Sequence, residues 1–185
     1  LCRCGIGEIS LVDFDTIDIT NINRQIHAMS NNIGKYKVDE MKKRIELINP
    51  DVKVNTFKKK LDKNNVENFN LKYYDYVVDA IDIITSKIYL IKCCYENNIN
   101  VISAMGAGNK LDPTRFKVVD IYKTSGCPLA RVMRRELKKL GIKKLKCVCS
   151  DEISSGEVIE SYDRRKSSPS SISFIPSTMG LIITS

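Results

Sequence analysis

The sequence predicts an α/β protein in which a mainly parallel sheet carries helices on both faces. Apolar segments of strand length alternate along the chain with segments whose apolar residues recur at helical spacing. Such alternation favours parallel strands joined by helical crossovers. At 185 residues, with 43% hydrophobic and 28% charged residues, the chain has the size and composition of a single globular domain covering residues 1–185.

Six segments predict strands. The first runs from Ile9 through Leu11 to Val12 before a polar stretch, and residues 74–80 have the apolar character of a buried strand. The predicted strands are residues 8–13, 52–57, 74–80, 100–104, 115–122 and 145–150.

Helical spacing marks the segments between these strands. In the first, Val38, Met41 and Ile45 recur on one face, and Asn49-Pro50 ends the helix. The predicted helices are residues 35–48, 84–97 and 128–140, with 62–69 as a short candidate and 180–184 as the start of another. The polar residues 161–171 predict a surface loop.

Composition limits the classes of protein. No apolar run reaches the roughly 18 residues that suggest a membrane span, and no secretory signal opens the chain. An odd count of seven cysteines then favours reduced thiols and a cytoplasmic location. The formal net charge of +8 suits a polyanionic partner, although lysine-rich surfaces often serve only solubility.

A polar stretch after the first strand predicts a nucleotide site. Asp13 ends the strand, where a carboxylate can accept hydrogen bonds from ribose hydroxyls. Asn21, Arg24 and Gln25 follow, and the planar guanidinium of arginine suits phosphate oxygens. Asp13 alone reads more readily as a turn residue, and only its place beside Arg24 and Lys37 favours the nucleotide role.

Two further residues extend this pattern. Lys37 follows Gly34 at the start of a predicted helix, where unpaired N–H groups favour anions. Asp82 follows the predicted strand 74–80, as does Asp79, which is either a second acid or a structural residue. Without other signals, Asp82 reads as an N-cap of the next helix and Lys37 as a solvated lysine.

The ordered set of Asp13, Asn21-x-x-Arg24-Gln25, Gly34-x-x-Lys37 and Asp82 resembles the ThiF/MoeB/HesA-like, ubiquitin-activating-like adenylyltransferases. The run from Met105 to Arg115 is similar to the TcdA (CsdL-like) branch, the tRNA threonylcarbamoyladenosine dehydratases. The sequence departs from the family in having Ile83 where an asparagine usually follows the acid.

The resemblance implies a Rossmann-like fold and the following roles. Asp13 would contact ribose, Arg24 the β- and γ-phosphates of ATP, and Asp82 Mg²⁺. The implied catalytic residues are Arg24, Lys37 and Asp82. The implied ATP-binding residues are Asp13, Asn21, Arg24, Gln25, Lys37 and Asp82.

The family pattern also implies a first strand and a glycine-rich loop, and neither is present before Leu1. We therefore expect a single ThiF-like nucleotide-binding domain that is truncated at both ends, by about 30 residues at the N-terminus, roughly one strand-turn-helix unit. This departure keeps open a third interpretation, an inactive RNA-binding or scaffold remnant.

The cysteine spacing argues against zinc. MoeB and ThiF relatives commonly carry two Cys-x-x-Cys pairs, and this sequence has none. The resemblance to a zinc-free branch implies the same.

A basic stripe marks the predicted helix 128–140. Leu129, Met133, Leu137 and Leu140 form an apolar stripe that would anchor the helix. The basic residues on the other stripe are Arg131, Arg134, Arg135, Lys138 and Lys139. Without the resemblance they read equally well as a solvated face; with it, contact with the tRNA backbone is favoured.

The preferred functional hypothesis is ATP-dependent dehydration, by cyclisation, of threonylcarbamoyladenosine in tRNA through an adenylated carboxylate. The alternative is an adenylyltransferase that activates the C-terminus of a ubiquitin-like sulfur-carrier protein. The family also implies a homodimer, and a sulfur-relay partner stays open.

Overall fold

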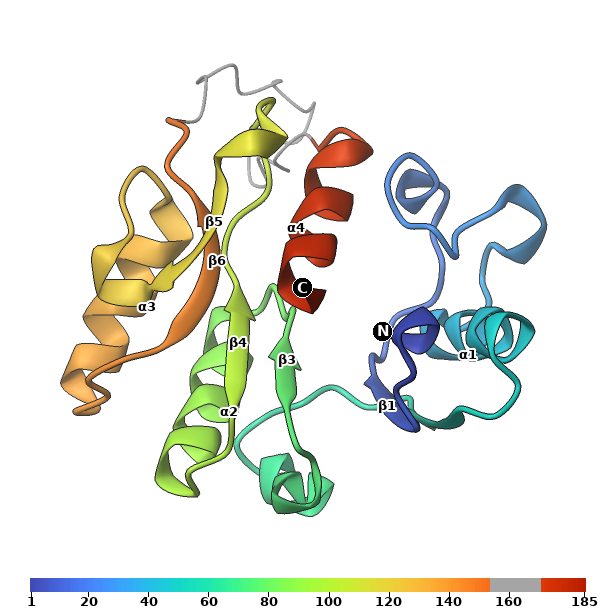
Figure 1. The fold of residues 1–185 in the computed structure, drawn as a ribbon, viewed down its shortest axis with the longest axis horizontal. Helices are drawn as coiled ribbons and strands as arrows, with labels where there is room; N and C mark the ends of the chain where they lie inside the picture. The colour runs from blue at the N-terminus through green and yellow to red at the C-terminus, as the bar shows by residue number, and fades with distance from the viewer. Residues whose placement is uncertain (154–170) are drawn as a thin grey trace. The chain divides into compact units, whose positions relative to one another are not determined.

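The structure is a computed structural model that describes residues 1–153 and 171–185. It divides into two compact units, Leu1–Leu61 and Asp62–Ser185, each with its own parallel strands and helices (Figure 1). The α/β class predicted from the sequence is confirmed. Most of the predicted loop 161–171 lies outside the described residues.

The first unit is a strand-helix-strand arrangement. Strands β1 (Glu8–Val12) and β2 (Lys53–Phe57) pair in parallel, and helix α1 (Lys37–Ile48) connects them. Its core consists of buried Ile45, Val52 and Val54, against which Ile9 and Leu11 pack. The apolar stripe of α1 and alternate residues of β1 therefore face the same interior.

The second unit contains a four-stranded sheet with the order β3-β4-β6-β5. Its strands are β3 (Val77–Asp79), β4 (Val101–Ala104), β5 (Phe116–Asp120) and β6 (Lys146–Ser150). The first three in spatial order are parallel, whereas β5 runs antiparallel to β6. No helical crossover separates β4 from β5, so the chain turns back and β5 reverses direction.

Helices cover both faces of this sheet, as predicted. Helices α2 (Ile84–Glu96) and α3 (Pro128–Lys139) pack on one face, where Cys147 and Cys149 point. Helix α4 (Phe174–Thr184) packs on the other face, against Val148. Alternation along β6 thus supplies two separate apolar layers.

Most predicted elements are confirmed, with shorter strands and a few corrections. The candidate helix at residues 62–69 is only a short 3₁₀ helix, Val66–Phe69, and the last helix begins earlier than residue 180, at Phe174. In the described part of the chain no helix is long and apolar enough to cross a membrane.

Candidate nucleotide site

Asp13 lies at the carboxyl end of β1 and shapes the turn that follows. Its backbone N–H donates to the carbonyl of Phe57 at 3.1 Å, which extends the pairing of β1 with β2. Its Oδ1 accepts a hydrogen bond from the N–H of Asp15 at 2.8 Å. The side chain is half-buried, and no described residue donates to its Oδ2. One carboxylate oxygen therefore holds the turn while the other is available to a ligand.

Residues 13–17 run antiparallel to residues 34–37. The N–H of Ile17 donates to the carbonyl of Lys35, and the N–H of Gly34 donates to the carbonyl of Ile17, each at 2.8 Å. Gly34 has a φ of 83°, a left-handed conformation that favours glycine. This short pairing places Lys37 beside the turn that Asp13 begins.

Lys37 forms an ion pair with Asp15, with 2.8 Å between Nζ and Oδ2. The lysine side chain is mostly covered, at 14% exposure, whereas Asp15 is 48% exposed. Its backbone N–H also donates to the carbonyl of Asp15 at 3.1 Å. The family-matched lysine is therefore fixed at the start of α1, with its charge directed to the polar turn.

The loop that carries Arg24 is built on Asn21. The buried Asn21 accepts a hydrogen bond from the N–H of Asp18 at 3.0 Å, and its carbonyl accepts from the N–H groups of Arg24 and Gln25. Asp18 in turn accepts from the N–H of Thr20 at 2.8 Å. Asn21 thus holds Arg24 and Gln25 in position.

Arg24 keeps a positive charge without an acidic partner in the described ranges. Its Nη1 donates to the carbonyl of Thr20 at 2.8 Å and to Oδ1 of Asn23 at 3.0 Å. These two neutral acceptors orient the guanidinium but leave its charge uncompensated. The arrangement suits binding of an anion such as phosphate.

Next to Arg24, two side chains bury polar atoms that have no hydrogen-bond partner among the described residues. They are Oε1 of Gln25 and both ring nitrogens of His27. Burial lowers the pKa of His27, and the charge of Lys37 lowers it further. His27 is therefore neutral at pH 7, and Gln25 has an unused acceptor near Arg24.

Asn32 organises this loop, a role that its place in the sequence does not predict. Its side chain is fully buried; Nδ2 donates to the carbonyl of His27 at 2.8 Å and to Glu40 Oε2 at 3.1 Å, while Oδ1 accepts from the N–H of Met29. Asparagines are common in loops, so only the contacts identify this one as structural.

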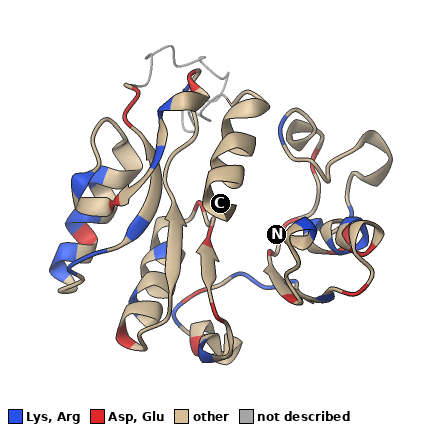
Figure 2. Cartoon of the chain, viewed as in Figure 1, with Lys and Arg blue, Asp and Glu red and all other residues tan. Residues whose placement is uncertain are grey.

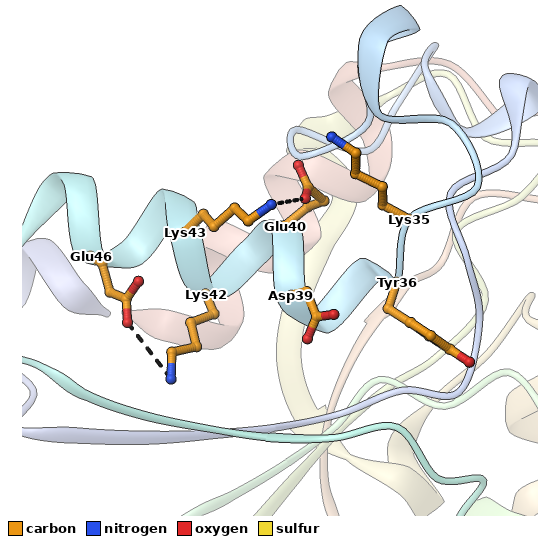
Figure 3. A pocket seen from close by; sticks show the side chains of 7 residues that line it. All are labelled: Lys35, Tyr36, Asp39, Glu40, Lys42, Lys43 and Glu46. Carbon is orange, nitrogen blue, oxygen red and sulfur yellow. Dashed lines mark hydrogen bonds and ion pairs between the residues drawn. The ribbon is translucent and has the colours of Figure 1, made fainter.

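A separate hollow of about 500 Å³ lies along α1, and its lining side chains, drawn in Figure 3, are mostly charged. They come from α1 and from Lys35 and Tyr36 just before it. Within it Lys43 pairs with Glu40 at 2.6 Å and Lys42 with Glu46 at 3.7 Å. None of Asp13, Asn21, Arg24, Gln25 and Lys37 lines it. The hollow is therefore distinct from the predicted nucleotide residues.

In the second unit, Asp79 and Asp82 differ sharply. Asp79 is fully buried, pairs with Lys87 at 2.9 Å, and accepts hydrogen bonds from Ser103 Oγ at 2.5 Å and from the N–H of Ile81. Asp82 is exposed and forms no ion pair with the described residues. Asp79 is therefore the structural acid, and it fixes the turn that presents Asp82 to solvent.

The loop that follows β4 is tied to the end of β6. The carboxylate of Glu152 accepts from the N–H groups of Leu111 at 2.9 Å and Asp112 at 3.1 Å. Nζ of the buried Lys110 donates to the carbonyl of Glu152 at 2.7 Å. These contacts were not apparent from the sequence, because the partners are about forty positions apart.

Basic residues gather along α3 (Figure 2), but not all of them are exposed as the predicted stripe requires. Arg131, Arg135, Lys138 and Lys139 are exposed. Arg134 is half-buried, and its Nη1 donates to the carbonyl of Thr124 at 2.9 Å and to the Thr124 hydroxyl. Leu140, placed on the apolar stripe, is 43% exposed because the helix ends at Lys139.

All seven cysteines lie within the described ranges and are free thiols. In those ranges no three histidine, cysteine or acidic side chains gather closely enough to hold a metal ion. The prediction that the protein carries no zinc stays a prediction.

Comparison with known proteins gives one consistent family. The chain is 45% identical over 196 residues to a tRNA threonylcarbamoyladenosine dehydratase of Bacillus subtilis (strain 168), covering 99% of this chain and 76% of that protein. It is 45% identical over 139 residues to the protein of the same name from Haemophilus influenzae, covering 75% of this chain and only 53% of that protein.

The solved structures most similar to this chain include relatives of the same name. A crystal structure of E. coli tRNA N6-threonylcarbamoyladenosine dehydratase, TcdA, in complex with ATP has a TM-score of 0.89 and 34% sequence identity. The match covers 98% of this chain and 74% of that one. The model of the ThiF family matches residues 1–180. The chain therefore belongs to the ThiF family.

Proposed function

We propose that this protein is an ATP-dependent tRNA threonylcarbamoyladenosine dehydratase. The observation that carries the proposal is the 45% identity to the B. subtilis dehydratase across 99% of this chain. The E. coli relative of the same name binds ATP in its crystal structure. We further propose a single ThiF-like domain over residues 1–185, a cytoplasmic location and a homodimer; a sulfur-relay partner is an open extension of the same resemblance.

ATP would bind at the polar turn after β1. The free Oδ2 of Asp13 suits a ribose hydroxyl, and the guanidinium of Arg24, which has no acidic partner in the described ranges, suits the β- and γ-phosphates. Asn21 positions Arg24, and the unpaired Oε1 of Gln25 offers one further acceptor to the nucleotide.

Lys37 would exchange its carboxylate partner, Asp15, for a phosphate of the nucleotide. It pairs with Asp15, a half-exposed acid whose contribution is weakened by solvent. A phosphate carries more charge than one carboxylate and can compete for the ammonium. Asp15 would thus hold Lys37 in place before the nucleotide binds.

Asp82 would hold Mg²⁺. An exposed carboxylate with no ion-pair partner among the described residues fits this ion, which usually takes one or two carboxylates together with phosphate oxygens and water. When bound, Mg²⁺ supplies charge neutralisation to the pyrophosphate. Asp79 would not share it, because its carboxylate is buried and already used.

The reaction needs no protein nucleophile. A carboxylate oxygen of the modified base would attack the α-phosphorus of ATP, the bond to the β-phosphate would break, and pyrophosphate would leave. An internal nitrogen or oxygen of the same group would then attack the adenylated carbonyl and expel AMP. The ring closes with net loss of one water, while Arg24, Lys37 and Asp82 position the phosphates and stabilise their charge.

The tRNA backbone would contact the exposed cations of α3, Arg131, Arg135, Lys138 and Lys139, while Arg134 supports the helix through Thr124. Exposed cations of this kind bind phosphates without reading sequence.

The alternative substrate is the C-terminus of a ubiquitin-like sulfur carrier. Pyrophosphate exchange, measured with ATP and Mg²⁺, separates the two functions: we expect exchange with threonylcarbamoyladenosine-modified tRNA and none with a carrier C-terminal peptide. The nucleoside recovered from the tRNA should be lighter by one water. Exchange with the peptide alone would favour the carrier function, and exchange with neither would favour the inactive remnant.

Two variants test whether the activity depends on Asp82. Asp82→Ala should abolish Mg²⁺-dependent AMP formation while the far-ultraviolet circular dichroism stays unchanged. Glu67→Ala removes an exposed acid from the same unit, outside the proposed site, and should keep activity. Normal turnover by Asp82→Ala would exclude the magnesium role.

A further inference from the structure

Cys127 is the N-cap residue of α3, and the N–H donors around its sulfur favour the negatively charged thiolate. Its Sγ accepts a hydrogen bond from the N–H of Ala130 at 3.5 Å, within the first turn of a twelve-residue helix. The N–H of Gly106 also points to it, and a Cβ at Gly106 would lie only 3.3 Å from the sulfur. The side chain is 3% exposed, so these donors act in a dry environment.

Cys149 is the direct neighbour of this sulfur. It lies on β6 in the same buried apolar cluster as Cys127 and is 5% exposed. Its Sγ lies 3.5 Å from the carbonyl oxygen of Ser150 and is also a hydrogen-bond partner of the Cys127 sulfur. This bond, together with the N–H groups of Ala130 and Gly106 and the charge of Lys110, lowers the pKa of Cys127 against the opposing effect of burial. The same bond and burial raise the pKa of Cys149. The pair therefore holds its charge on Cys127 and its proton on Cys149.

Cys147 gives a comparison within the same core. It lies two residues from Cys149 on β6 and faces the same apolar layer. Burial raises its pKa to about 12, so it stays protonated. Burial alone thus yields an inert thiol, and the hydrogen bonds around Cys127 distinguish that sulfur from its neighbours.

We propose that Cys127 and Cys149 form a redox-active pair that a hydroperoxide converts to an intramolecular disulfide. The Cys127 sulfur attacks the peroxide oxygen, the O–O bond breaks, and hydroxide leaves, so sulfur is oxidised to sulfenic acid and the peroxide is reduced. The Cys149 sulfur then attacks the sulfenic sulfur. An S–S bond forms, the S–O bond breaks, and the hydroxide leaves as water with the thiol proton.

The burial of both thiols selects small oxidants. Hydrogen peroxide is close to water in size, whereas the loop at Gly106 covers Cys127 against bulky disulfides and alkylating reagents. The bond would join the start of α3 to β6 and would be reopened by a dithiol reductant. The chemistry requires neither ATP nor tRNA, so its test is independent of the proposed enzyme activity.

The experiment uses the full chain, reduced and then treated with one equivalent of hydrogen peroxide. After alkylation under denaturing conditions and trypsin digestion, we expect a reducible cross-link between peptides 124–131 and 147–164, which contain Cys127 and Cys149. The cross-link should persist in Cys147→Ser and be lost in Cys127→Ser and Cys149→Ser. In Cys149→Ser, dimedone should trap a sulfenic acid on Cys127.

The pH dependence provides a second readout. The rate at which hydrogen peroxide oxidises Cys127 should be nearly constant from pH 7 to 9, because the sulfur is already ionised. Oxidation of Cys93, whose pKa is raised by burial, should rise about tenfold per pH unit. Cys149→Val, which keeps an apolar side chain in the core, repeats the test if the serine variant fails to fold.

Any one of four results would overturn the proposal. The cross-link could form through Cys147 instead, survive the Cys149→Ser change, or fail to form while Cys93 is oxidised first. Absence of a dimedone adduct on Cys127 in both Cys149 variants would also exclude it.

Discussion

The carboxylate of Asp79 and the ammonium of Lys87 form an ion pair of 2.9 Å in which neither side chain is exposed to solvent. Asp79 ends β3 and Lys87 lies in α2, so the pair fixes the helix to the strand that precedes it. Ser103 on β4 donates to the same carboxylate. One buried charge pair thus connects three neighbouring elements.

Lys87→Met should lower the free energy of unfolding by about 3–5 kcal/mol, because it leaves the Asp79 carboxylate buried without a counter-charge. Urea unfolding followed by circular dichroism measures the loss. Lys92→Met, on the same helix, removes a lysine from the exposed pair with Glu96 and should cost less than about 0.5 kcal/mol. Equal losses in the two variants would contradict a special role for the buried pair.

Gly126→Ala should destabilise the protein more than Gly141→Ala does. Both glycines are left-handed, with φ of 71° and 72°, so each alanine costs roughly 1–2 kcal/mol. Only at Gly126 would the new Cβ also lie 2.8 Å from the carbonyl oxygen of Asp151, whereas nothing lies within 4 Å at Gly141. Thermal melting of both variants makes the comparison, and a larger loss at Gly141 would refute it.

Arg24→Ala should weaken ATP binding and slow adenylation more than Lys35→Ala does. Arg24 has only neutral acceptors in the described ranges, while Lys35 lines the separate hollow on α1. Loss of a charge-assisted phosphate contact costs about 1.5–3 kcal/mol, or roughly 10- to 150-fold in affinity. Isothermal titration with a non-hydrolysable ATP analogue provides the measurement. Equal effects from both variants would move the nucleotide site elsewhere.

Stability should fall as the pH drops below about 6.5, and His27 should be the cause. Its folded-state pKa is lowered, so the unfolded chain binds a proton that the folded chain does not, and protons then favour unfolding. His27 is the only histidine, so His27→Gln should flatten the dependence between about pH 6.5 and 5.5. The measurement is the midpoint of urea unfolding at each pH in this range. If the midpoint of the variant depends on pH as steeply as that of the original protein, the His27 imidazole is not the cause.

Replacing the exposed cations of α3 with glutamine should weaken tRNA binding. The slope of log K against log salt concentration should also become shallower by about 0.9 for each phosphate contact that is lost. The variant combines Arg131→Gln, Arg135→Gln, Lys138→Gln and Lys139→Gln. Filter binding across a salt series is the measurement. A charge-matched control replaces four exposed lysines of another segment, Lys58, Lys59, Lys60 and Lys63, with glutamine. Equal losses in both would show a general charge effect rather than a site.

The sequence predicted elements whose signal is local. Helix α1 follows from the spacing of Val38, Met41 and Ile45, and its end follows from Asn49-Pro50. The reversed direction of β5 was missed because an extended segment has the same pattern in either direction. The family motif pointed to Arg24, whose neutral acceptors leave its charge uncompensated.

Contacts between distant positions could not be predicted in the same way. Lys87 had no assignable role, since its partner is known only once α2 packs on the sheet. Arg134 looked like its neighbours until the fold brought Thr124 to it. The pairing of Cys127 with Cys149 depends on where the N-cap of α3 meets β6, which no spacing rule contains.

The position of β6 between β4 and β5 has a consequence for synthesis on the ribosome. Strands β4 and β5 emerge first, yet each pairs with β6 and they are not neighbours of each other. Until residue 150 has left the exit tunnel, both strands present open backbone edges and uncovered apolar side chains, a state prone to association with other nascent chains. This nascent chain is therefore expected to need chaperone protection until the central strand inserts.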